Sequence, residues 1–214
     1  MKQVDSEAAE GLHSLSINPY SQSLRKINNE TVWEINTLND YAYQKIILPL
    51  LSKDRFFIDH YKTEYLVKNR NLSQVDLDQL VKMNLSGSDT SIFTIAFQTP
   101  TSFKSDGKYV NMPSLRFIYQ SLIMKFDASS NNLQMMSDDI LNQLINHSTI
   151  VDYRLRSARF FLEKSSIPSF MGEMTIKVYG TKQLKGIVNL LLNFGVYSGM
   201  GIKASLGMGS MQLK

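Results

Sequence analysis

The order of apolar patterns in residues 89–214 limits the fold more tightly than any other feature of the sequence. Period-2 alternation predicts strands, and apolar residues at helical spacing predict helices. The patterns predict strands at 91–97, 149–163 and 172–179, helices at 113–126, 138–147 and around 184–191, and a short final strand. Pro113 suits the first turn of its helix. The series strand, helix, strand, strand, helix, strand is that of a ferredoxin-like α+β domain.

Residues 1–88 show the same series less completely. The patterns predict helices at 4–16, 40–51 and 75–83 and strands at 31–37 and 64–69, which we interpret as the series without its opening strand. A polar stretch at 84–90 has the composition of a linker, so we place a boundary near residue 88. We therefore expect two tandem ferredoxin-like (βαββαβ) domains, at 1–88 and 89–214, the first lacking its opening strand.

The composition excludes several classes of protein. The chain has no cysteine, which excludes disulfide scaffolds, thiol nucleophiles, zinc fingers and iron–sulfur clusters. No segment reaches the roughly 18 apolar residues that suggest a membrane span, and the acidic N-terminus is unlike a signal peptide. We expect a cytoplasmic protein. Residues 1–88 carry 10 basic and 11 acidic side chains, whereas 89–214 carry 13 and 8, so an anionic partner is expected at the second domain.

A glycine-rich segment at 195–209 holds five of the 11 glycines. Its dinucleotide-like pattern lacks the preceding strand and the following helix that such a site needs. The open alternatives are a backbone that approaches a nucleic-acid phosphate, or a loop of tight turns packed on the sheet. The candidate nucleic-acid-binding residues of this segment are Gly199, Gly201, Lys203, Gly207 and Gly209.

Basic side chains elsewhere in the second domain form a second candidate interface. Arg154, Arg156 and Arg159 belong to one predicted strand, on which the first two share a face. Lys104 and Lys108 flank a turn. These residues can neutralise nucleic-acid phosphates, although a solvated face with scattered charges is the alternative reading.

His13 is the one histidine that the sequence favours for proton transfer. His13, His60 and His147 lack the spacing and carboxylate neighbours of a metal site, so no metal is expected. His13 lies at the end of the first predicted helix, before a proline-bearing loop, where a histidine can exchange protons with a substrate near neutral pH.

Four segments occur in order and at the separations of a known family. They are 97–104 (FQTPTSFK), 109–113 (YVNMP), 167–172 (IPSFMG) and the glycine-rich segment 195–209. Together they resemble the CRISPR-associated repeat-processing endoribonucleases of the RAMP superfamily, in the form found in type III systems of Gram-positive bacteria. The resemblance implies two ferredoxin-like domains and metal-independent cleavage of precursor CRISPR RNA, with no cofactor. In that reaction a 2′-hydroxyl attacks the adjacent phosphorus, giving a 2′,3′-cyclic phosphate and a 5′-hydroxyl.

The resemblance also implies site residues and partners. Leu12-His13 matches the position of the family's catalytic histidine, which makes His13 the general base or acid. Lys26 or Arg25 would supply a cation, and Tyr20 would position the RNA. Beyond precursor CRISPR RNA, the partners expected are effector-complex subunits and a second copy in a homodimer. Relatives carry an opening strand before the first helix, so we expect an incomplete first domain. The alternative is a non-catalytic RNA-binding subunit or a cleavage-impaired remnant.

Overall fold

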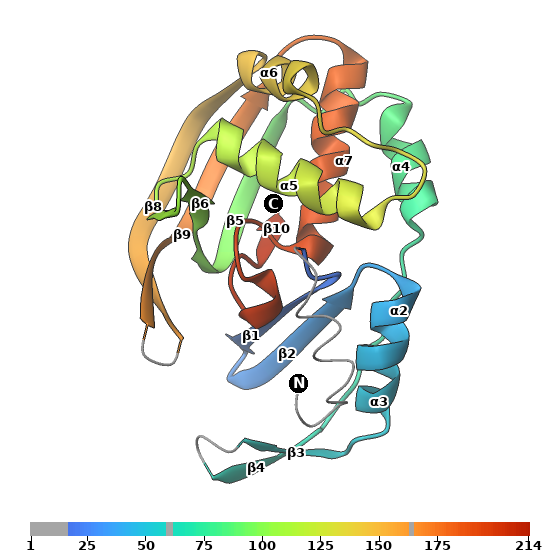
Figure 1. The fold of residues 1–214 in the computed structure, drawn as a ribbon, viewed down its shortest axis with the longest axis vertical. Coiled ribbons are helices and arrows are strands. Elements are labelled where there is room, and N and C mark those ends of the chain that lie inside the picture. Colours follow the sequence, from blue (N-terminus) through green and yellow to red (C-terminus); the bar gives the residue numbers. More distant parts are fainter. Residues whose placement is uncertain (1–16, 59–61, 163–164) are drawn as a thin grey trace.

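A computed structural model describes residues 17–58, 62–162 and 165–214. Its largest sheet has the strand order β10-β5-β9-β8, with every neighbouring pair antiparallel. The strands are β5 (Ile92–Thr101), β8 (Ser148–Leu162), β9 (Ser165–Val178) and β10 (Met211–Leu213). Helices α5 (Leu115–Ser129) and α7 (Lys182–Ser198) pack together over one face (Figure 1). This is the ferredoxin-like arrangement predicted for the second half of the chain.

The core lies between that sheet and its helices. Ile95 on β5 stands opposite Met174 on β9, and both side chains are buried, as period-2 alternation requires. Leu122 of α5 and Leu191 of α7 belong to the same buried cluster. Burial of these apolar residues is the main contribution to the stability of this half.

The helix starts agree with the sequence except at one proline. Ser114 caps α5 by accepting a hydrogen bond from the Phe117 amide, so the helix begins at Leu115 and Pro113 lies just before the cap. The predicted start at Pro113 was therefore wrong by two residues. Helix α6 (Asp138–Asn146) is capped by Ser137, and α7 is capped by Thr181, whose hydroxyl accepts from the Leu184 amide.

Strands β8 and β9 form a hairpin much longer than the rest of the sheet. β9 begins at Ser165, although the sequence predicted a start at 172. Its pairing with β5 runs only from Ile92 opposite Lys177 to Thr101 opposite Phe170, so residues 165–169 pair with β8 alone. The hairpin therefore extends beyond the helices (Figure 1).

A second hairpin follows residue 19. Strands β1 (Tyr20–Ile27) and β2 (Glu30–Thr37) are joined by Asn28 and Asn29, with φ angles of 49° and 66°. Positive φ at both turn residues is the mark of a type I′ turn, which asparagine tolerates well. β2 was predicted and β1 was not. The helix predicted at 4–16 lies outside the described residues.

The remaining elements of the first half are short. A helical segment capped by Asn39 comprises α2 (Asp40–Ala42), a π-helical turn at Tyr43–Ile47 and α3 (Leu48–Leu51), which confirms the helix predicted at 40–51. Strands β3 (Arg55–Ile58) and β4 (Thr63–Leu66) form a small hairpin, and β4 corresponds to the strand predicted at 64–69. Helix α4 (Leu77–Leu85) corresponds to the one predicted at 75–83.

Helix α4 packs against α7 of the second half. Leu77, Leu80 and Val81 are packed on the main core. At the end of α4, the Asn189 side chain donates a 2.6 Å hydrogen bond to Asn84 Oδ1. Residues on both sides of position 88 thus share one core, and the domain boundary predicted there stays a prediction. None of the described helices is long and apolar enough to cross a bilayer.

Candidate functional site

The glycine-rich loop begins where α7 ends and returns along β5. Two backbone hydrogen bonds hold the loop to the end of β5 and the residue after it. Ile202 N donates to Ser102 O (3.0 Å), and Gly209 N donates to Pro100 O (3.1 Å). Gly209 has a φ of +71°, and a Cβ there would lie 1.9 Å from Met200 O. Glycine is therefore required at this position by close backbone packing. Of the two alternatives, the tight-turn geometry is present, and contact with RNA remains a proposal.

Strand β1 of the first half contacts this loop at Ser205. The Gln22 amide donates to Ser205 O at 2.6 Å, and the Asn18 amide donates to Ser205 Oγ at 3.2 Å. The Tyr20 hydroxyl also hydrogen-bonds Ser205, and burial raises the pKa of Tyr20 above its ordinary value. Tyr20 therefore stays protonated near neutral pH, and its hydrogen bond joins β1 to the loop.

A strip of polar atoms runs along β1 beside the second half. Ser21 Oγ donates to the Tyr197 carbonyl at the end of α7. Ser23 and Arg25 follow at two-residue spacing, so their side chains share a face with Ser21. Ser23 Oγ and Arg25 Nε are buried and have no hydrogen-bond partner among the described residues. Since buried polar groups are nearly always paired, this strip is a candidate contact for a polar ligand.

The two basic residues proposed as the cation occupy opposite faces of β1. Arg25 is largely buried, with 13% of its side chain exposed, and it pairs with Glu34. Its Nη1 also lies 3.5 Å from Gln98 Oε1 on β5, which turns it toward the second half. Lys26 is exposed close to the Asn28–Asn29 turn. Of the two, the structure brings only Arg25 into the strip.

Of the three histidines, only His147 lies among the described residues. His13 and His60 lie outside the described residues. His147 ends α6, where its Nδ1 lies 2.9 Å from Gln143 O. Within 17–58, 62–162 and 165–214, no cluster of three histidine, aspartate or glutamate side chains has the arrangement of a metal site.

The predicted basic interface is divided between two faces of the long hairpin. Arg154 and Arg156 stand opposite Glu173 and Met171, on the face away from the helices. Arg159 stands opposite Pro168 on the other face, because it lies three positions after Arg156 and an odd spacing changes the face of a strand. Exposed Lys104 and Lys108 lie on strands β6 (Phe103–Ser105) and β7 (Lys108–Val110), around the predicted turn.

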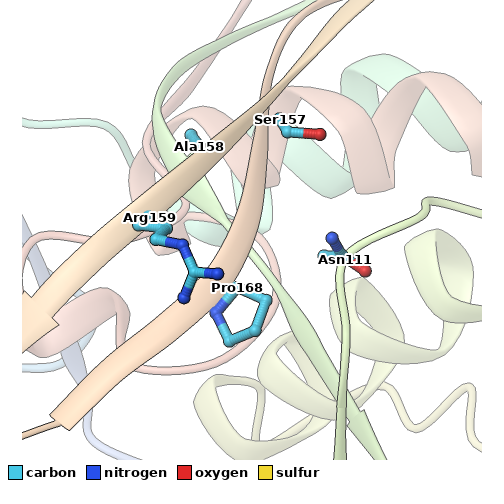
Figure 2. Close-up of a pocket in the computed structure, with 5 residues that line it drawn as sticks. All are labelled: Asn111, Ser157, Ala158, Arg159 and Pro168. Carbon is cyan, nitrogen blue, oxygen red and sulfur yellow. The ribbon is translucent and has the colours of Figure 1, made fainter.

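A shallow pocket lies beside Arg159. Its volume is about 380 Å³, and its lining consists of Asn111, Ser157, Ala158, Arg159 and Pro168. Figure 2 shows Asn111 across the hollow from Arg159 and Pro168, which come from neighbouring strands. The guanidinium of Arg159 is held by a 3.2 Å hydrogen bond to Ser166 Oγ. The pocket thus combines one positive charge, an amide and an apolar ring, and an unstacked nucleotide has complementary chemistry.

One residue at the loop was not anticipated from the sequence. Lys125 on α5 donates from Nζ to the carbonyls of Ser198 (3.2 Å) and Gly199 (2.9 Å). Burial lowers the pKa of Lys125 to about 7. The available signal was a lysine within the apolar run 122–126 of a core helix, since lysine is rarely buried there without a partner.

The structure defines a class of α+β protein with a candidate anion-binding junction. The junction lies where the polar strand β1 contacts the glycine-rich loop of the ferredoxin-like half. Comparison with known proteins narrows the class. The family described as CRISPR-associated endoribonuclease Cas6 matches residues 95–211. The Streptococcus thermophilus protein of that description is 37% identical over 214 residues, covering all of this chain and 88% of that protein. The Mycobacterium tuberculosis counterpart is 31% identical over 219 residues and is covered to 69% of its length. The chain belongs to the CRISPR-associated endoribonuclease Cas6 family.

Solved structures agree on the fold. A Cas6 product complex aligns with a TM-score of 0.85 at 18% identity, covering 100% of this chain and 89% of that one. A Thermus thermophilus Cas6 product complex aligns with a TM-score of 0.78 at 22% identity, covering 100% and 88%. These similarities confirm the predicted α+β, ferredoxin-like architecture.

Proposed function

We propose that this protein cleaves precursor CRISPR RNA within its repeats and thereby releases guide RNAs. The observation that carries the proposal is similarity along the entire chain, at 37% identity, to a protein named as a CRISPR-associated endoribonuclease. The polar strip beside the glycine-rich loop supports it further, because two of its buried polar atoms have no hydrogen-bond partner in the described part of the chain and Arg25 lies in the strip.

The proposed chemistry is an internal transesterification. A ribose 2′-oxygen attacks the adjacent phosphorus, the bond to the 5′-oxygen breaks, and the products carry a 2′,3′-cyclic phosphate and a 5′-hydroxyl. The step needs one group that removes the 2′-hydroxyl proton, one that protonates the leaving 5′-oxygen, and donors for the charge that develops on the phosphate. None of these three roles requires a metal ion.

In this proposal His13 carries the proton transfer, as the family resemblance implies. Arg25 is the preferred cation, because it is largely buried in the strip and lies 3.5 Å from Gln98 across the junction. Lys26 is the alternative cation, which would have to act from the exposed face of β1. Tyr20 acts indirectly, by holding β1 to Ser205 of the loop.

The RNA contacts extend from the junction along the second half. The glycine-rich loop brings backbone close to a phosphate, with the basic side chain of Lys203 in the same segment. Lys104, Lys108 and the three arginines of β8 neutralise further phosphates, and the pocket at Arg159 receives one nucleotide. The contacts predict an affinity that falls steeply as salt concentration rises.

Protein partners are proposed for the first half. Several large apolar side chains are exposed there, among them Leu24 (62%) and Leu66 (70%). Exposed apolar side chains of this kind are typical of association surfaces when they gather in one patch. We propose a second copy or a subunit of a CRISPR effector complex as the partner, in the cytoplasm.

Cleavage assays with histidine variants test the function and the site together. The wild-type protein should cut labelled repeat RNA, and His13→Ala should reduce the rate by at least about 100-fold, the usual size of a general acid–base contribution. His147→Ala is the matched control, since His147 caps α6 through Gln143 and should retain activity. Equal rates for wild type and His13→Ala would refute the site assignment, and binding without any product would favour a non-catalytic RNA-binding subunit.

A further inference from the structure

The C-terminal end of α7 points its carbonyl groups at the start of the glycine-rich loop. The last carbonyls of a helix lack partners within the helix and carry a partial negative charge. Such an end repels an anion. A loop that must approach an RNA phosphate therefore needs this end to be neutralised.

Lys125 supplies that neutralisation from a different helix. Its ammonium donates to Ser198 O at 3.2 Å and to Gly199 O at 2.9 Å, the last helical carbonyl and the first of the loop. One turn earlier on α5, Ser121 Oγ accepts a 2.8 Å hydrogen bond from Gly201 N. Because residues four apart share a helix face, a single face of α5 holds Ser198, Gly199 and Gly201, where α7 passes into the loop.

We propose that Lys125 is a positioning residue of the RNA-binding site, which fixes Gly199 and offsets the negative end of α7 so that the loop can approach an RNA phosphate. The inference rests on the proposed function, since it assumes that the loop binds RNA. It adds a residue that lies about 75 positions away from the loop and that the family resemblance did not point to.

The surroundings of Lys125 make its protonation sensitive to RNA. Burial lowers its pKa to about 7, with no contribution from a charged side chain of residues 17–58, 62–162 or 165–214. The neighbouring charged group on α5, Asp127, is engaged by the amides of Met135 and Met136 at 2.8 Å. In the loop, Lys203 is itself a cation. A phosphate bound at the loop would add an anion near Lys125, and it would favour the protonated form.

Linkage then gives a measurable signature. At about pH 8, Lys125 of the free protein has largely lost its proton. If bound RNA raises the pKa of Lys125, formation of the complex takes up a proton at that pH. By the same linkage, RNA affinity should fall as the pH rises through 7. A purely structural lysine would leave both quantities unchanged.

Calorimetric titration tests the inference with three proteins: the wild type, Lys125→Met and Lys125→Arg. The probe is a repeat RNA that carries 2′-O-methyl groups throughout, so cleavage cannot occur. Titrations at about pH 8 in two buffers of different ionisation enthalpy report the protons taken up. The wild type should take up between about half and one proton more than either variant, because arginine stays charged and methionine cannot titrate. Lys125→Met should bind about tenfold more weakly, and Lys125→Arg should recover most of the affinity.

Thermal unfolding of each variant shows that a weaker affinity does not come from an unfolded protein. If Lys125→Met shows the affinity and the proton uptake of the wild type, the inference is overturned and the proposed function stands. A wild-type protein that fails to bind the RNA would overturn the proposed function, and the inference with it.

Discussion

Replacing Gly209 by alanine should destabilise the glycine-rich loop more than any other single methyl addition in it. The new Cβ would lie 1.9 Å from Met200 O and 2.9 Å from the carbonyl carbon, while Met200 N donates to Gly209 O at 2.7 Å. The backbone on both sides must then separate. A left-handed conformation costs an L-residue about 1–2 kcal/mol, and overpacking adds about 1–3 kcal/mol. We expect a loss of about 2–5 kcal/mol in the free energy of unfolding.

Gly207→Ala is the matched control for that experiment. Gly207 also has a positive φ, +106°, but an added Cβ would meet no atom of the described residues within 4 Å. Its substitution therefore introduces only the left-handed backbone cost of about 1–2 kcal/mol, without a clash. Urea unfolding of the two variants measures the difference, and filter binding of repeat RNA measures the effect on the site. Equal destabilisation by both substitutions would refute the packing derived for the loop.

Three further predictions concern the residues around the loop. The folded-state pKa of Lys125 is about 7, below its ordinary value of 10.5, so the unfolded chain binds more protons than the folded protein between these two values. The free energy of unfolding of the wild type should therefore rise with pH across that window. Lys125→Met should lack this rise, which urea unfolding at several pH values measures. Tyr20→Phe removes a hydrogen bond to Ser205 and should lower the free energy of unfolding by about 1 kcal/mol, whereas an unchanged value would show that the bond is not made in solution. Arg25→Met should lower kcat for RNA cleavage more than Lys26→Met, and the reverse order would favour the exposed lysine as the cation.

The second half of the fold was predictable because its patterns are strong. Buried residues such as Ile95 and Met174 alternate with polar ones, and the helices carry wide apolar faces. β1 was missed for the opposite reason. Ser21 and Arg25 form polar contacts with the second half. The buried Ser23 shares their face, so the strand lacks an apolar stripe. Local patterns report burial against an apolar core, and β1 is partly buried against polar groups.

The candidate site divides in the same way. The glycine-rich loop was evident from the sequence, because a cluster of glycines indicates backbone conformations that other residues rarely adopt. The choice between Arg25 and Lys26 depended on the parity of a strand that the sequence did not reveal. Lys125 could not be assigned to the loop from sequence, since its partners Ser198 and Gly199 lie more than 70 residues away and only the packing of α5 on α7 brings them together.

The central claim is that this protein cuts repeat RNA by 2′-hydroxyl attack without a metal ion. The most direct measurement is incubation of the purified protein with labelled repeat RNA in EDTA, followed by analysis of the product ends. The account predicts a single cut in the repeat that leaves a 2′,3′-cyclic phosphate and a 5′-hydroxyl, with no product from an RNA that has a 2′-deoxyribose at the cut position. Cleavage that requires added magnesium, or that proceeds equally well at the 2′-deoxyribose, would contradict it.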